Sequence, residues 1–162
     1  METKLAREIG ELLKQKGLTL GVVESATGGL ISHFITNIPG SSEYYKGSVT
    51  AYSNEIKIKV IGVKVGTLEK FGSVSTQVAE EMALGGKNIL GVDICIADTG
   101  IAGPGGATPD KAVGLFYLGL ADKNGALSQR HKFYDDREQN KQSAAGAALS
   151  WLKEYLLGLE DT

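Results

Sequence analysis

The sequence is poor in cysteine and proline, and it lacks both a long hydrophobic run and an excess of basic residues. Its one cysteine, Cys95, excludes an internal disulfide bond and fits a reducing compartment. No stretch approaches the roughly 18 apolar residues of a membrane-spanning helix, and the charged first residues are atypical of a signal peptide. We therefore expect a cytoplasmic location and no membrane partner.

The balance of charge excludes further classes of protein. The chain has 17 basic and 19 acidic residues and a formal net charge of −2, so direct nucleic-acid binding through a basic surface is not expected. One cysteine and two well-separated histidines do not suffice for a common zinc site. We therefore expect neither a metal ion nor a cofactor.

Glycine is abundant, with 22 residues against three prolines. The glycines cluster in loops between apolar runs, which is typical of binding loops built from backbone atoms. The chain shows no repeat, linker or low-complexity segment, and its 42% hydrophobic content is ordinary for a globular protein. Residues 1–162 are therefore expected to form a single domain.

Apolar patterns predict five strands, at residues 18–23, 48–52, 94–97, 113–121 and 127–134. Helices separate the first three strands, which predicts parallel pairing. The sequence Asp-Lys-Asn-Gly at 122–125 predicts a hairpin that adds an antiparallel strand. Together these signals predict an α/β fold, a three-layer α/β/α sandwich around a mixed five-stranded sheet.

Helix signals fill the intervals between the predicted strands. Ser53 or Asn54 can cap a short helix that Gly62 ends, and Ser75 caps a longer helix. Gly85 and Gly86 weaken that longer helix. We therefore expect its end to pack closely on a neighbouring element.

Three loops follow the strands that are predicted to be parallel, at residues 24–29, 53–57 and 99–111. The carboxyl ends of parallel strands share one rim, where ligands bind in open α/β sheets. We therefore expect Ser25, Tyr52, Lys57 and the loop 100–106 to converge. This convergence predicts a functional site.

Ser25 lies in a glycine-backed turn between a strand and a helix, and two roles are open for it. It is either a nucleophile beside the N–H groups of a helix N-terminus or only a helix cap. Lys57 could act as its base if burial lowers the pKa of the amine, or it could be solvated like Lys59. Tyr52 could donate a hydrogen bond to either group, and the two histidines are poorly placed for a Ser-His-Asp triad.

Two further features suggest an anion-binding region. Residues 99–106 (TGIAGPGG) can wrap an anion with backbone N–H groups, although the same composition suits a flexible crossover. Arg137 opens the last predicted helix beside Asp135 and Asp136. It could hold a phosphate there.

Five ordered motifs in this sequence resemble one known family. They are residues 24–29 (ESATGG), 39–42 (PGSS), 52–57 (YSNEIK), 72–75 (GSVS) and 99–106 (TGIAGPGG). Together they resemble the C-terminal domain of the competence/damage-inducible CinA proteins, also known as nicotinamide-nucleotide amidases. The resemblance extends over about residues 5–157.

The resemblance implies an activity and a set of site residues. The family reaction is hydrolysis of nicotinamide mononucleotide to nicotinate mononucleotide and ammonia, in pyridine-nucleotide salvage. The Ser-Tyr-Lys constellation of the family falls on Ser25, Tyr52 and Lys57. N–H groups around Thr27 and Gly28 are expected to stabilise the oxyanion. The residues implied for substrate binding are Thr27, Gly28, Ser42, Thr99, Gly100, Gly103 and Arg137.

The resemblance also bears on assembly and on alternatives. Many family members carry an N-terminal pyrophosphatase domain, and this chain resembles the stand-alone amidase form, for which a homodimer is expected. Four positions depart from the family pattern, namely Ala26, Ala112, Asp135 and Lys141. A non-catalytic nucleotide-binding module, or an interaction module linked to competence or DNA damage, is therefore the alternative interpretation.

Overall fold

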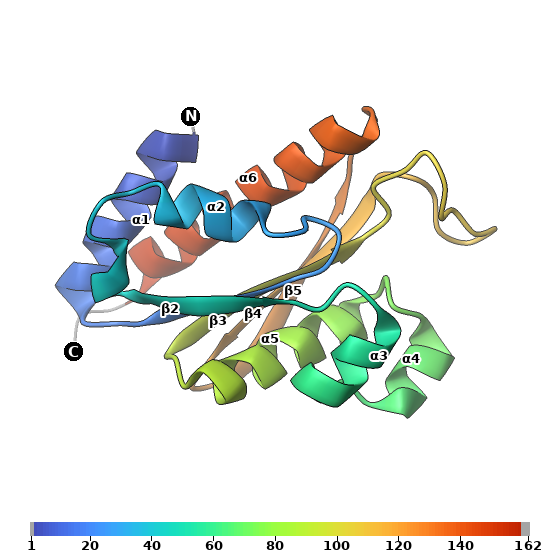
Figure 1. The fold of residues 1–162 in the computed structure, drawn as a ribbon, viewed down its shortest axis with the longest axis horizontal. Coiled ribbons are helices and arrows are strands. Elements are labelled where there is room, and N and C mark those ends of the chain that lie inside the picture. The colour runs from blue at the N-terminus through green and yellow to red at the C-terminus, as the bar shows by residue number, and fades with distance from the viewer. Residues whose placement is uncertain (1, 160–162) are drawn as a thin grey trace.

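The fold is built on one mixed sheet of five strands (Figure 1), seen in a computed structural model that describes residues 2–159. The strand order is β2-β1-β3-β4-β5. The three parallel strands are β1 (Leu20–Glu24), β2 (Tyr45–Thr50) and β3 (Ile94–Gly100). The hairpin partners are β4 (Leu115–Asp122), antiparallel to β3, and β5 (Gly125–Lys132), antiparallel to β4. The predicted mixed five-stranded sheet is confirmed.

Helices cover both faces of the sheet and complete the three predicted layers (Figure 1). One face is covered by α1 (Glu2–Lys16), α2 (Leu30–Thr36) and α6 (Arg137–Gly158). The other face is covered by α3 (Asn54–Ile56), α4 (Val65–Phe71) and α5 (Thr76–Leu90). A 3₁₀ turn at Ser41–Glu43 and a π-helical turn at Lys57–Ile61 complete the elements. None of the helices within residues 2–159 is long and apolar enough to cross a membrane.

Strand β3 divides the core between the two helical layers. Ile94 and Ile96 point toward α1, α2 and α6, whereas Cys95 and Ala97 point toward α5. All four side chains are buried. This is the arrangement that a continuous apolar run predicts for a strand covered on both faces.

Strand β2 begins three residues earlier than its apolar pattern predicts and ends at Thr50. It is an edge strand whose residues alternate between partial burial and exposure, so its pattern is weak. The chain leaves the sheet after Ala51, whose N–H donates to the Glu24 carbonyl. Tyr52 therefore lies beyond the strand, just before the Ser53 hydroxyl caps α3.

Close packing at the end of α5 is confirmed. A Cβ atom on Gly85 would collide with the backbone of Ile61 in the π-helical turn, and one on Gly86 would collide with Val23 of β1. Glycine at these two positions lets α5 pack directly on the backbone of the π-helical turn and on the side chain of Val23 in the sheet.

Candidate active site

A hollow of about 300 Å³ lies at the carboxyl ends of the parallel strands. Its walls come from the turn after β1, from residues 52–57, from Ser73 and Val74, from the loop 99–106 and from Arg137. The convergence expected from the sequence is therefore present in the fold.

Ser25 and Lys57 are in direct contact inside this hollow. The Lys57 Nζ lies 2.9 Å from the Ser25 Oγ. Only 2% of Lys57 and 7% of Ser25 is exposed to solvent. A buried hydroxyl held against a buried amine is the arrangement of a nucleophile with its general base.

Two backbone carbonyls fix the orientation of the Lys57 amine. Nζ also lies 2.9 Å from the Ala51 oxygen and 3.0 Å from the Tyr52 oxygen. A neutral amine donates two N–H bonds to these carbonyls and then directs its lone pair at the third neighbour, the Ser25 Oγ. The same contacts therefore orient the amine to receive the hydroxyl proton.

Burial lowers the pKa of Lys57 from its ordinary value, because desolvation disfavours the ammonium form. The charge of Asp98 opposes this shift by favouring the ammonium. Lys57 is held by carbonyl and hydroxyl oxygens rather than by a carboxylate. The net effect on the pKa is downward, the direction that increases the share of neutral amine.

The π-helical turn separates Lys57 from its neighbour Lys59. Lys57 opens the turn and is buried, whereas the exposed Lys59 forms an ion pair with Glu55 at 2.6 Å. The wide turn closes where the Val63 N–H donates to the Lys57 carbonyl at 3.0 Å. Both lysines occupy similar sequence contexts, so the pattern of residues could not show which one is buried.

Tyr52 lies at the mouth of the hollow, and its hydroxyl contacts neither Ser25 nor Lys57. The side chain is 62% exposed. Arg137 donates from Nη2 to the Tyr52 hydroxyl at 3.2 Å and from Nη1 to the Gly103 carbonyl at 2.8 Å. The hydrogen bond expected between Tyr52 and the Ser25–Lys57 pair is therefore replaced by one to Arg137.

The glycine loop is anchored in its first half, at Thr99 and Ala102. The buried Thr99 hydroxyl donates to the Ser73 carbonyl at 2.7 Å. The buried Asn140 amide of α6 donates to the Ala102 carbonyl at 3.0 Å. At Gly100 a Cβ atom would meet the ring of Phe116, so glycine is required there by packing. The loop is a fixed wall of the hollow at these points.

The N–H groups expected to form the oxyanion site are already engaged. The Thr27 N–H donates to Asp98 Oδ2 at 3.1 Å, and the Gly28 N–H donates to the Ser25 carbonyl at 3.1 Å. Within residues 2–159, no atom accepts a hydrogen bond from the Ala26 N–H, and Ala26 lines the hollow. The donor available beside Ser25 is thus the N–H of the next residue.

Three residues implied for substrate binding lie outside the hollow. Thr27 and Gly28 line a neighbouring depression between α2 and α6. Ser42 is exposed in the 3₁₀ turn before the amino end of β2, at the opposite end of that strand from the hollow. A site at the carboxyl ends of the strands therefore does not include Ser42.

Two buried carboxyl groups support the Ser25 turn and were missed in the sequence. Asp98 accepts from the Ser25 N–H at 2.9 Å, and Glu24 accepts from the Ile31 N–H at 2.9 Å. Burial raises the pKa of Asp98 to about 6 from 3.8. The available signal was an acidic residue directly after a buried apolar strand, which occurs at both positions.

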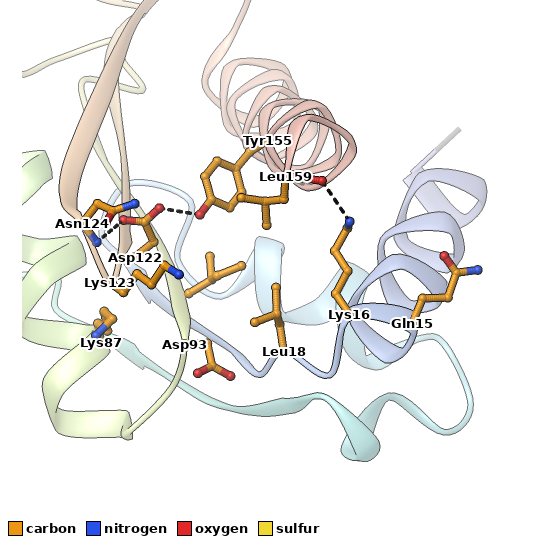
Figure 2. Close-up of a pocket in the computed structure, with 11 residues that line it drawn as sticks. Gln15, Lys16, Leu18, Lys87, Asp93, Asp122, Lys123, Asn124, Tyr155 and Leu159 are labelled. Carbon is orange, nitrogen blue, oxygen red and sulfur yellow. Dashed lines mark hydrogen bonds between the residues drawn. The ribbon is translucent and has the colours of Figure 1, made fainter. Parts of the chain in front are cut away.

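A larger hollow of about 460 Å³ lies at the amino ends of the strands (Figure 2). Figure 2 shows the Tyr155 hydroxyl directed at Asp122 and the Lys16 amine directed at the Leu159 carbonyl. Among the residues that the structure describes, no serine, threonine or cysteine lines it. The smaller hollow with Ser25 is therefore the candidate active site.

Comparison with known proteins places this architecture in a family. The family model for the CinA C-terminal domain matches residues 2–156. The chain belongs to this family. A CinA-like protein of Salinibacter ruber is 45% identical over 148 residues, which is 91% of this chain and 36% of that protein. This CinA domain spans between 36% and 39% of the length of the relatives it matches.

Solved structures of the CinA superfamily share the fold of this CinA domain. A competence/damage inducible protein from Agrobacterium tumefaciens is 37% identical, with a TM-score of 0.90 over 96% of this chain and 94% of that one. A CinA superfamily protein from Klebsiella pneumoniae is 28% identical, with a TM-score of 0.95 over 98% and 99% of the two chains. These descriptions refer to competence and damage and do not state a reaction.

Proposed function

We propose that this domain hydrolyses the carboxamide of nicotinamide mononucleotide, giving nicotinate mononucleotide and ammonia. The observation that carries the proposal is the buried contact of 2.9 Å between Lys57 Nζ and Ser25 Oγ. An amide carbon is a poor electrophile, and an activated serine lets its hydrolysis proceed in two easier steps through a covalent intermediate.

In the first step Lys57 receives the proton of the Ser25 hydroxyl. The Oγ atom forms a bond to the carboxamide carbon, and the electron pair of the carbonyl moves to its oxygen. The Ala26 N–H, which has no acceptor among residues 2–159, donates to this oxyanion. One such donor contributes about 3–4 kcal/mol to comparable reactions.

In the second step the amide nitrogen leaves as ammonia. The Lys57 ammonium returns its proton to that nitrogen as the C–N bond breaks, and the acyl group stays on Ser25 Oγ. Water then attacks the ester carbon while Lys57 receives a proton from the water. The bond between this carbon and Ser25 Oγ breaks, and the Lys57 ammonium returns its proton to Oγ, so nicotinate mononucleotide departs and both side chains are restored.

We assign the phosphate of the substrate to the wall of the hollow that Arg137 and the glycine loop form. Arg137 has guanidinium N–H groups beyond the two that bond to Gly103 and Tyr52, and these can donate to a phosphate. The backbone of Gly105 and Gly106 lines the same wall. In this proposal Tyr52 orients Arg137 and does not carry the proton of Ser25.

The test is incubation with nicotinamide mononucleotide, following ammonia and nicotinate mononucleotide together. We expect Ser25→Ala and Lys57→Ala each to abolish product formation while the far-ultraviolet circular dichroism spectrum is retained. Lys59→Ala is the matched control, because that lysine is exposed and lies two residues away. Near wild-type turnover by Lys57→Ala would contradict the assignment of the base. Calorimetric binding of the mononucleotide without turnover would indicate the alternative, a nucleotide-binding module.

A further inference from the structure

Three buried side chains form a network directly beneath the Ser25 turn. The Thr27 hydroxyl oxygen lies 2.6 Å from Glu24 Oε1 and 2.5 Å from Asp98 Oδ1. Glu24 and Asp98 are fully buried, and only 1% of Thr27 is exposed. Two carboxyl groups thus meet at one hydroxyl in the absence of solvent.

The number of hydrogens available determines the protonation state of this network. The Thr27 hydroxyl carries one hydrogen and can donate it to one carboxyl oxygen only. Both contacts have the short O–O distance of a hydrogen bond in which one partner is charged. The second contact is satisfied when the other carboxyl group is protonated and donates to the Thr27 oxygen. The network is therefore complete with one proton shared by the two carboxyl groups.

The backbone contacts indicate which carboxyl group holds this proton. Glu24 accepts from the Ile31 and Ser32 N–H groups in the first turn of α2, where a negative charge is favoured. Asp98 accepts from the Ser25 and Thr27 N–H groups of a turn, with no helix end behind them. The raised pKa of Asp98 agrees with this assignment.

The surroundings of Asp98 contain few other charges. Asp98 lies on the face of the sheet that α2 and α6 cover, and α6 packs there through buried alanines such as Ala145. The neighbouring strand β4 pairs Leu118 with Asp98. The charged groups coupled to Asp98 are Glu24 from β1 and Lys57 from the π-helical turn.

We propose that Asp98 is a positioning residue whose carboxyl group shares one proton with Glu24 across the Thr27 hydroxyl and thereby holds the Ser25 turn beside a neutral Lys57. Two hydrogen bonds, from the Ser25 and Thr27 N–H groups to the Asp98 carboxyl group, fix the turn. The shared proton removes one negative charge that would otherwise favour the Lys57 ammonium. The consequence for catalysis rests on the proposed function, whereas the shared proton is a property of the free protein.

The direct test is a titration of the aspartate side-chain carbons by ¹³C NMR on the whole chain without substrate. Comparison with Asp98→Asn assigns the resonance. We expect the Asp98 carbon to keep the chemical shift of the acid at about pH 5, where a peptide aspartate is ionised. An Asp98 resonance that titrates with a midpoint near ~4, as in a peptide, would overturn the proposal.

Two variants of Thr27 test the bridging hydroxyl. Thr27→Val removes the oxygen that accepts the Asp98 proton, so the acid form loses its partner and we expect the midpoint of Asp98 to fall by about half a pH unit or more. Thr27→Ser keeps a hydroxyl and is expected to retain the wild-type midpoint. An unchanged midpoint in a folded Thr27→Val chain would contradict the bridge, and the wild-type titration decides the matter if that variant does not fold.

The catalytic consequence is measured with the same pair of variants. We expect Thr27→Val to have a kcat about tenfold or more below that of Thr27→Ser with a similar KM, because the nucleophile is displaced and binding is not. Equal kcat values in the two variants would refute the positioning role. If every form, including the wild type, releases no ammonia, the proposed function fails, and the titration still decides where the proton resides.

Discussion

Arg137 donates a hydrogen bond to the hydroxyl of Tyr52 across the mouth of the hollow, at 3.2 Å, although 85 positions separate the two residues in the chain. Arg137 also donates to the Gly103 carbonyl, so it joins the 52–57 segment to the glycine loop. The Ser25–Lys57 contact lies deeper in the same hollow. In the proposed function, the Ser25–Lys57 pair and the anion-binding Arg137 therefore lie at different depths of one cavity.

Tyr52→Phe tests this separation. If Tyr52 only orients Arg137, the variant loses one hydrogen bond at the substrate-binding wall, and KM for nicotinamide mononucleotide rises about three- to tenfold. The value of kcat stays close to that of the wild type. Steady-state kinetics of ammonia release measure both constants. A loss of kcat by about a hundredfold at unchanged KM would instead assign Tyr52 to proton transfer.

The pH dependence of the rate tests the neutral amine. Only the neutral form of Lys57 can receive a proton, so kcat/KM rises with pH as the ammonium is lost. Because burial lowers the pKa of Lys57, the plateau is expected below 10.5, the ordinary lysine value. Lys57→Arg is expected to be inactive at every pH, because a guanidinium stays protonated. A rate that still rises through pH 10.5 would contradict this assignment.

The stability of the chain should depend on pH through Asp98. Its pKa is raised to about 6 from 3.8, so the folded state binds this proton more tightly than the unfolded state. The stabilisation is fully present below pH 3.8 and is lost as the pH rises through about 6. Urea unfolding of the wild type and Asp98→Asn measures it. As the pH rises, the free energy of unfolding of the wild type should fall relative to that of Asp98→Asn. A difference that stays constant with pH would refute the prediction.

Replacing a glycine with alanine in α5 should lower the stability of the chain, whereas the same replacement in α4 should raise it. Gly85→Ala places a Cβ atom against the Ile61 backbone, so we expect a loss of about 1–3 kcal/mol of stability. Gly66→Ala is the matched control, because no heavy atom lies within 4 Å of the added Cβ atom in α4. That variant should gain about 0.5–1 kcal/mol. Equal effects of the two substitutions in thermal unfolding would disprove the close contact.

Much of the fold was predictable because its signals are local. The apolar run around Cys95 predicts a strand buried on both faces, and the turn residues at 122–125 predict the hairpin between β4 and β5. The limits of β2 were not predictable to the same degree, because an edge strand with Lys46 and Thr50 exposed has little hydrophobic pattern.

The site was predictable only in part, because its geometry depends on contacts between distant segments. Parallel strands predict that Ser25 and Lys57 share a rim, but only the π-helical turn decides that Lys57, and not Lys59, points inward. The N–H groups of Thr27 and Gly28 are unavailable as oxyanion donors for a similar reason. The Asp98 carboxyl group, 71 positions away from Thr27, accepts the N–H bond that was expected to be free.

The burial of Lys57 has a consequence for the evolution of the chain. An amine enclosed by carbonyl oxygens instead of water lowers the free energy of unfolding, because the ammonium loses its hydration and the neutral form must be maintained. An apolar side chain of similar length, as in Lys57→Met, would avoid the desolvation of an amine but would leave the Ala51 and Tyr52 carbonyls without this donor. Under the proposed function, selection for reactivity at Lys57 thus opposes the cost of burying its amine.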